Sequence, residues 1–149
     1  MLYYFNSKNS SVAQSLYLQL ENMITSLISP GQPIVVMCIG SDRSTGDSLG
    51  PLTGYKLKKA GLNNISVIGT LNHPVHAANL NITLKKVYSA YNNPFIIAID
   101  ASLGKENHIG YITLATGPLK PGLGVKKKLP EVGDIHITGI VNSAGIMDN

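Results

Sequence analysis

Two aspartates stand where a carboxylate could take part in chemistry. Asp47 closes a Gly-rich stretch, residues 40–46, that follows the apolar run 33–39, and Asp100 directly follows the apolar run 95–99. A carboxylate at the end of an apolar strand is partly desolvated unless a partner compensates it. If two such carboxyl groups meet, they cannot both ionise easily, so one pKa is raised and the other is lowered. Together they would form an acid and a base that can activate water.

Each aspartate also has a structural explanation. An Asp after a Gly-rich turn commonly caps the N-terminus of a helix, and the pattern alone favours this role for Asp47. An Asp that ends a buried strand, as Asp100 is expected to do, often caps the following turn. Capping gives no reason for the two side chains to converge, so their placement distinguishes the two explanations.

The elements that must position these residues follow from apolar spacing. Helices are predicted over residues 11–29, from about Asp47 to Ala60 with Gly61 as the C-terminal cap, and over residues 77–91. The third helix is expected to bury Leu80, Leu84, Val87, Tyr88 and Tyr91 on one face. Continuous apolar runs predict strands at 33–40, 65–69 and 95–99, with further strands at 111–115 and 135–141.

Alternation of helices and buried strands specifies an α/β fold, a three-layer sandwich with a mainly parallel sheet. Residues 1–149 are predicted to form a single domain, since a chain of this length can bury a substantial core. The last predicted strand is not followed by a closing helix, so we expect the domain to continue beyond Asn149. In such sheets ligands bind beyond the carboxyl ends of the strands, which is where both aspartates are expected.

Composition narrows the classes of function. Hydrophobic residues make up 44% and charged residues 13% of the chain, which is typical of a globular domain, and the net charge of +4 is a mild bias. Basic and aromatic residues are not interleaved, so nucleic-acid binding is not favoured. The sequence contains no apolar stretch near the ~20 residues that span a bilayer. With Cys38 as a single cysteine inside an apolar run, these features predict a cytoplasmic protein without a membrane partner.

The Gly-rich stretch does not match a nucleotide-binding loop. A phosphate loop of the Walker type has four residues between its glycines and a lysine after the second one, whereas here five residues intervene and Asp47 takes the lysine position. A carboxylate at that position would repel phosphate. A nucleotide-binding protein is therefore disfavoured, and no cofactor is expected.

Five segments together resemble the YyaC sporulation family. They include Asp47-Ser48-Leu49-Gly50-Pro51 and Ile99-Asp100-Ala101-Ser102-Leu103-Gly104, and they span residues 39–51, 70–77, 98–104, 117–125 and 132–142. The resemblance runs from about residue 33 to the end of the chain. That family is similar to the germination protease of spore-formers and, more distantly, to the hydrogenase-maturation endopeptidases.

The resemblance implies a phosphorylase/hydrolase-like fold, as in the hydrogenase-maturation peptidases, and a peptidase of the mother cell or forespore. Its implied substrates are small, acid-soluble spore proteins or other sporulation proteins. The catalytic aspartates of the germination protease, in Asp-x-Leu-Gly-Pro and Ile-Asp-Ala, fall on Asp47 and Asp100. Ser102 stands where the family usually has a cysteine, which argues against an obligatory thiol nucleophile and leaves Ser102 as a hydrogen-bonding neighbour.

Further neighbours of the pair are expected from the adjoining segments. His76 is the better histidine candidate, because it is expected at the start of a helix that faces the cleft. Backbone N–H groups of Gly46 and Ser48, or of the turn 122–124, could stabilise an oxyanion. The complete set of expected neighbours is Asp42, Gly46, Ser48, His76, Ser102, Gly122 and Gly124.

The site is predicted to work without a metal. The hydrogenase-maturation relatives hold nickel through a Glu, an Asp and a His, and Gly122 stands at the position that corresponds to their histidine. Two carboxylates alone suit Mg²⁺ or Ca²⁺ better than nickel or zinc, so only His76 could complete such a site. The leading hypothesis is thus an aspartate-dependent endopeptidase, and the alternative is a non-catalytic peptide-binding or checkpoint protein on the same fold. The oligomeric state is left open.

Overall fold

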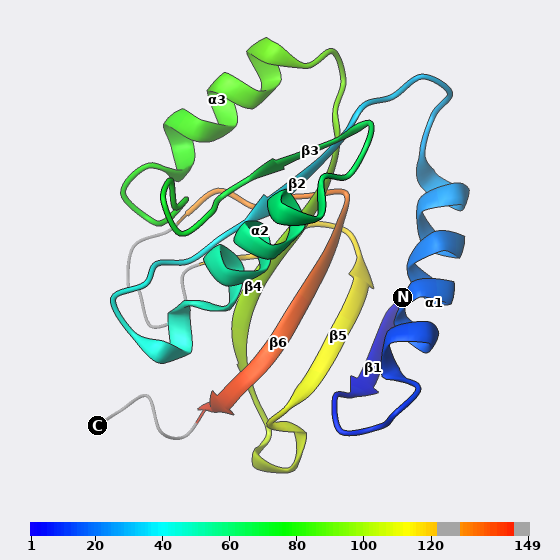
Figure 1. The fold of residues 1–149 in the computed structure, drawn as a ribbon, viewed down its shortest axis with the longest axis vertical. Helices are drawn as coiled ribbons and strands as arrows, with labels where there is room; N and C mark the ends of the chain where they lie inside the picture. Colours follow the sequence, from blue (N-terminus) through cyan, green and yellow to red (C-terminus); the bar gives the residue numbers. More distant parts are fainter. Residues whose placement is uncertain (122–128, 145–149) are drawn as a thin grey trace.

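The computed structural model describes residues 1–121 and 129–144 of the 149-residue chain. Figure 1 shows the helices α1 (Val12–Leu27), α2 (Leu49–Ala60) and α3 (Leu80–Ala90), with short 3-10 turns η1 (Thr45–Asp47) and η2 (Glu106–His108). The strands are β1 (Leu2–Asn6), β2 (Ile34–Cys38), β3 (Ile65–Ile68), β4 (Phe95–Gly104), β5 (Tyr111–Thr116) and β6 (Ile135–Ser143). None of the helices in the described ranges is long and apolar enough to cross a membrane.

One six-stranded sheet organises the fold, in the order β1-β5-β6-β4-β2-β3. The strands β3, β2, β4 and β6 run parallel to one another, whereas β5 is antiparallel to both β6 and β1. The predicted α/β fold with a mostly parallel sheet is confirmed.

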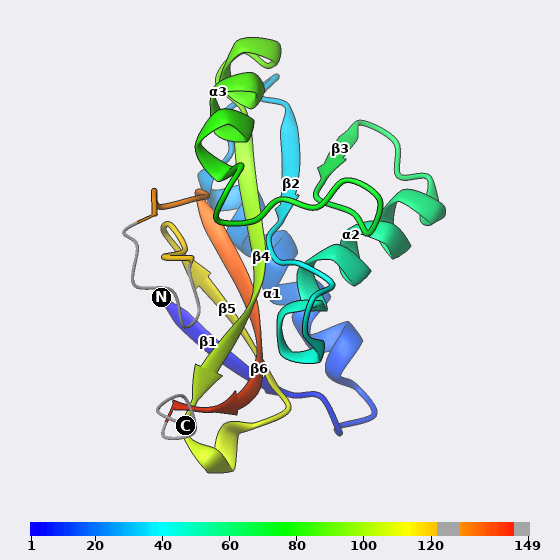
Figure 2. The same cartoon turned by 90° about the vertical axis from the view of Figure 1, so that its left-hand side faces the viewer.

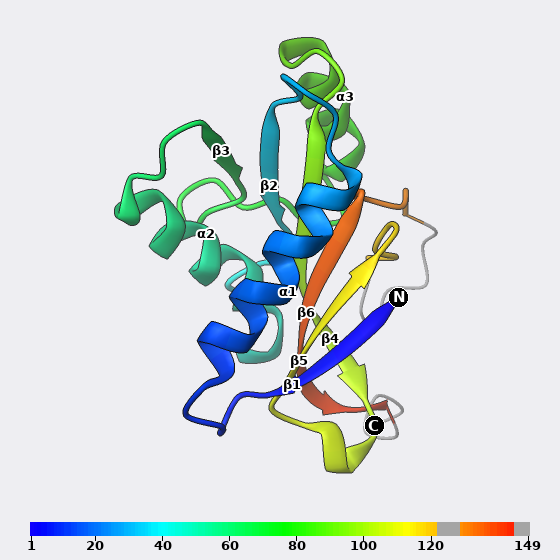
Figure 3. The same ribbon diagram turned by 90° about the vertical axis from the view of Figure 1, so that its right-hand side faces the viewer.

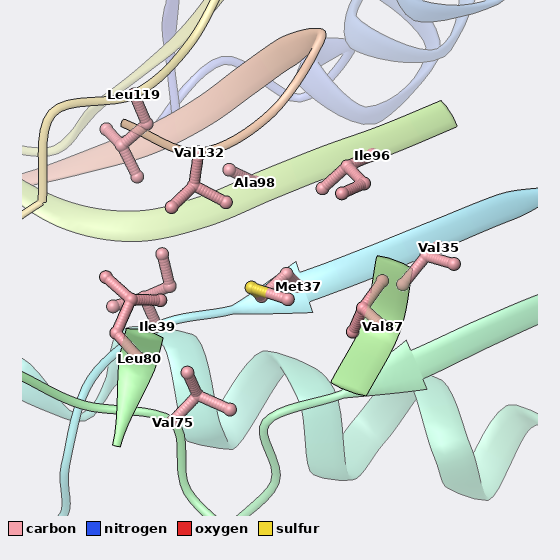
Figure 4. Packing of buried hydrophobic residues seen from close by; sticks show 10 residues of the cluster. All are labelled: Val35, Met37, Ile39, Val75, Leu80, Val87, Ile96, Ala98, Leu119 and Val132. Atoms are coloured by element: carbon pink, nitrogen blue, oxygen red, sulfur yellow. The ribbon is translucent and has the colours of Figure 1, made fainter. Parts of the chain in front are cut away.

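Helices cover both faces of the sheet, which makes three layers. Figures 2 and 3 show α3 on one side and α1 and α2 on the other. Alternate residues of the central strands face the two layers. Val35, Met37 and Ala98 pack with Leu80 and Val87 of α3, as Figure 4 shows. Their neighbours along the strands, among them Val36, Cys38, Ile97 and Ile99, pack on the side of α1 and α2.

Two glycines let α2 approach the sheet closely. A Cβ at Gly50 would lie 2.0 Å from the Ile39 carbonyl oxygen, and one at Gly54 would lie 1.9 Å from that of Gly69. The helix ends at Gly61, which adopts the left-handed conformation with φ 65°. The predicted C-terminal cap is therefore confirmed. The close approach of α2 at Gly50 also holds the loop that carries Asp47 against the end of β2.

Four features of the structure differ from the sequence predictions. The strand β1 was not predicted. The helix α3 begins at Leu80 rather than residue 77, since the Asn79 side chain accepts the His76 N–H (2.8 Å) and donates to the Pro74 carbonyl in a turn before the helix. Tyr88 is 60% exposed rather than buried.

The fourth difference concerns β4, which continues through Asp100 instead of ending before it. Its pairing with β2 stops at Cys38 and Ile99, but its pairing with β6 continues, with Asp100 opposite Thr138. Asp100 therefore lies inside a strand, just past the point where β2 leaves the sheet.

Candidate active site

A pocket of about 260 Å³ opens where β2 ends. Segments far apart in the sequence form its walls: the loop after β2, the turn before α3, the middle of β4, and Pro121 with Leu129. Asp47 and Asp100 both line it, as does His76. The two aspartates thus share one pocket at the carboxyl edge of β2, where the sequence placed them.

Asp100 forms the buried floor of this pocket. Its residue is 3% exposed, and its Oδ1 atom has no hydrogen-bond partner among the described residues. Burial raises the pKa of Asp100 from 3.8 to about 7, with a smaller contribution from the charge of Asp47, while the backbone N–H of Ala101 opposes the shift. Near neutral pH, Asp100 can therefore hold a proton that an exposed aspartate would have lost.

Asp47 is held by Ser41. The Ser41 backbone N–H donates to Asp47 Oδ2 at 3.0 Å, and the Ser41 hydroxyl donates to the same oxygen at 3.1 Å. The N-cap position of α2 belongs to Ser48, so the helix-capping explanation for Asp47 is wrong. Gly40 makes this closure possible, because its φ is 144° and a Cβ there would lie 2.3 Å from the Asp47 carbonyl oxygen.

His76 lines the pocket with a defined ring tautomer. Its Nδ1 accepts a hydrogen bond from the Ala78 backbone N–H at 3.2 Å. Because Nδ1 is the acceptor, a neutral ring carries its proton on Nε2. His73, by contrast, is exposed and is not among the residues that line the pocket.

Four of the other expected neighbours, Asp42, Gly46, Ser48 and Ser102, are not among the residues that line the pocket. Asp42 and Gly46 are exposed, and Ser48 is the N-cap residue of α2. Ser102 lies two residues further along β4, and its hydroxyl donates to Thr138 Oγ1 at 3.1 Å instead. Gly122 and Gly124 fall outside the described residues.

Ser41 and Arg43 were missed as site residues, although both line the pocket. Both lie in the Gly-rich stretch that Asp47 closes, and this stretch was the one sequence signal that could have identified them as site residues. From the sequence alone, a polar residue in such a loop is expected to face solvent. Only the folded structure shows that the loop turns back on itself. Among the residues described, no group of three or more His, Cys, Asp or Glu could hold a metal ion. Metal independence stays a prediction.

The sequence matches known proteins over most of its length. Residues 4–149 match the family model described as "Protein of unknown function (DUF1256)". The chain is 52% identical over 132 residues to "Uncharacterized protein YyaC" of Bacillus subtilis (strain 168). This match covers 87% of the chain and 64% of the relative, so the chain spans less than two thirds of that relative's length. The resemblance to YyaC is confirmed, and the chain belongs to the DUF1256 family.

Proposed function

We propose that this chain is a metal-independent peptidase in which Asp47 and Asp100 activate water, on a phosphorylase/hydrolase-like variant of the α/β fold. The observation that carries the proposal is the buried, unpartnered Oδ1 of Asp100 in the pocket that Asp47 also lines. A buried polar atom without a partner costs about 1–3 kcal/mol. A protein tolerates that cost where the atom has a task, such as binding substrate or water.

Asp100 serves as the general acid. With its pKa raised to about 7 by burial, it is largely protonated at slightly acidic to neutral pH. Its proton goes to the nitrogen of the leaving amine as the C–N bond breaks. An Asn at this position would keep the shape but would have no proton to transfer in this way.

Asp47 serves as the general base. Its carboxylate removes a proton from a water molecule, whose oxygen then bonds to the carbonyl carbon of the substrate while the carbonyl electrons move to the oxygen. The two hydrogen bonds from Ser41 to Oδ2 fix the orientation of this carboxylate. The products are a new carboxyl terminus and a new amine, and no cofactor is consumed.

His76 replaces Gly46 and Ser48 as the donor to the oxyanion in this proposal. The hydrogen bond from Ala78 to Nδ1 leaves Nε2–H as the donor in the neutral ring, and the ring lines the pocket with both aspartates. A donor held in place before the reaction stabilises the developing charge without reorganisation.

The substrate is proposed to be a peptide segment of a sporulation protein, with small, acid-soluble spore proteins as the first candidates. The family resemblance supports this choice and the location in the mother cell or forespore. The pocket is compatible with a side chain of mixed character, because Ile39 and Leu129 line it together with Arg43.

The test is hydrolysis of a forespore protein extract, followed by mass spectrometry of new termini. The wild type is expected to cut, whereas Asp100→Asn and Asp47→Asn should lose activity by about 10³-fold, a typical effect for an acid or base. Asp42→Asn is the matched control, since Asp42 is an exposed carboxylate of the same loop outside the pocket. Equal activity of Asp100→Asn and wild type would reject the mechanism. Peptide binding without any cleavage by the wild type would favour the non-catalytic alternative.

A further inference from the structure

The two edge strands of the sheet, β1 and β3, differ in how they are protected. Beside β3, a hollow is lined by the charged Lys58. The strand β1 contains neither a charged residue nor a proline, and its pairing with β5 has no bulge. Soluble proteins usually place one of these features at an edge, because an edge without them pairs readily with a further strand. The β1 edge is therefore open to such pairing.

The free backbone groups of this edge belong to Leu2 and Tyr4. The Thr116 N–H of β5 donates to the Met1 carbonyl at 3.0 Å, so the backbone of Met1 faces β5. Because bonding to one neighbour alternates along an antiparallel strand, Leu2 and Tyr4 direct their N–H and C=O groups away from β5. Within the described ranges, no protein group bonds to these outward-facing groups.

We propose that β1 pairs with β1 of a second copy of this chain, antiparallel and about a twofold axis, so that the two sheets become continuous. In this register Leu2 of each copy lies opposite Tyr4 of the other, and Tyr3 lies opposite Tyr3. Each Leu2–Tyr4 pair exchanges two hydrogen bonds, which satisfies every outward-facing group of both residues. A register shifted by two residues would pair Asn6 with Leu2, but the Asn6 carbonyl already accepts the Asn9 N–H at 3.0 Å.

The side chains of this edge also complement themselves. Leu2 and Tyr4 lie on the same face of the sheet and are 54% and 48% exposed. Directly opposite residues of paired strands share a face, so each exposed Leu2 would contact an exposed Tyr4 ring of the other copy. The N-terminal amine donates to Thr116 Oγ1 and is not part of the free edge. Pairing of two copies therefore covers apolar surface without burying a charge.

The helix α1 leaves this edge accessible. It packs over β1 and β5, and Figure 3 shows β1 beside it at the open edge of the sheet. A hollow of about 380 Å³ separates the two elements at this edge, and Met1, Tyr3, Met23 and Leu27 are among the residues that line it. The Tyr3 rings of two paired copies would meet beside this hollow, where α1 does not block them.

The other side of α1 borders a groove that is a poorer docking surface. This apolar groove between α1 and α2 has a volume of about 410 Å³, and its lining includes Leu20, Leu57, Ile97 and Ile137. Apart from Leu62, its lining residues are buried or half-buried within the chain itself. The β1 edge, by contrast, combines exposed side chains with free backbone groups.

Sedimentation velocity over a concentration series tests the proposal, with protein that carries no N-terminal tag. The wild type should change from monomer to dimer with a Kd of about 10 µM, because a small interface gives weak association. Tyr4→Lys places a charge on the edge and should weaken dimerisation by about tenfold or more. Tyr88→Lys is the matched control, since Tyr88 is 60% exposed on α3 and should leave dimerisation unchanged.

A cysteine at Tyr3 tests the register independently. Across the twofold axis the two Tyr3 residues form a non-hydrogen-bonded pair with Cα atoms about 4.5 Å apart, which lies within the range that a disulfide bridges. Under mild oxidation Tyr3→Cys should form a covalent dimer, whereas Leu18→Cys, at a 48% exposed position of α1, should not. The native Cys38 is buried and does not compete.

These measurements leave clear ways to overturn the proposal. A wild type that stays monomeric well above the expected Kd contradicts it, and so does a dimer that Tyr4→Lys leaves intact. If Tyr4→Lys does not fold, as judged by circular dichroism, the cross-link decides: Tyr3→Cys that forms no more covalent dimer than Leu18→Cys rejects the pairing.

Discussion

The pocket around Asp100 and the groove between α1 and α2 lie on opposite faces of one sheet, yet they differ in what holds them. In the pocket, hydrogen bonds from Ser41 orient Asp47, and Asp100 keeps an oxygen without a partner. In the groove, the lining is almost entirely aliphatic and contains no titratable side chain. Hydrogen bonds fix direction, whereas apolar contacts fix only shape. The pocket therefore holds polar groups in fixed directions, whereas the groove presents only an apolar shape.

The most sensitive test of this comparison is a substitution in α2, because this helix contributes to both regions. Leu49 of α2 lines the groove, and the adjacent Gly50 contacts Ile39, which lines the pocket. In Gly50→Ala the new Cβ would lie 2.0 Å from the Ile39 carbonyl oxygen. The gain in helix propensity is about 1 kcal/mol, and we expect the clash to exceed it and destabilise the fold by about 4 kcal/mol or more.

Urea denaturation of both proteins measures this effect. Gly46→Ala serves as the control, because the nearest atom to its new Cβ, on Val141, is 3.9 Å away. Unchanged stability of Gly50→Ala would show that α2 can move away without loss and that the two regions do not depend on its close packing.

The next largest effect should distinguish the two regions by how the stability of the fold depends on pH. Asp100 has a folded-state pKa of about 7 against an ordinary value of 3.8, so between these values the folded state keeps a proton that the unfolded state has lost. Stability should therefore fall as pH rises through this window, by on the order of 3 kcal/mol between about pH 5 and about pH 8. Asp100→Asn should lack this dependence and be more stable than the wild type at the higher pH.

Chemical denaturation across this pH range provides the measurement. The groove variant Leu20→Trp should keep the pH dependence of the wild type, because no titratable side chain lines the groove. Parallel profiles for the wild type and Asp100→Asn would contradict the assignment of the buried proton to Asp100.

The smallest effect concerns the orientation of Asp47. Ser41→Ala removes the hydroxyl donor at 3.1 Å and leaves the backbone donor at 3.0 Å in place. One hydrogen bond to a carboxylate contributes about 1.5 kcal/mol, so we expect kcat/KM of the proposed peptidase activity to fall about tenfold. Ser41→Thr keeps a hydroxyl and should restore kcat/KM.

Local pattern predicted much of the fold. The helix α1 and the strands β2 and β4 could be predicted because the pattern of apolar residues within each segment indicates which of its residues are buried. Gly61 ends α2 as predicted, because few other residues adopt its conformation easily. Asp47 and Asp100 could also be identified as candidate residues from local pattern, since a carboxylate beside an apolar strand is visible in the sequence.

Tertiary structure decided the rest. Asp100 lies inside β4 because β6, 35 residues later at Ile135, extends the pairing after β2 has left. Ser41 is a site residue because its loop folds back so that its N–H donates to Asp47. The strand β1 is part of the sheet because it pairs with the edge of β5. The groove shows the limit most clearly: the isoleucines of β4 and β6 indicate that their face is to be covered, but which element covers it depends on contacts between segments distant in the sequence.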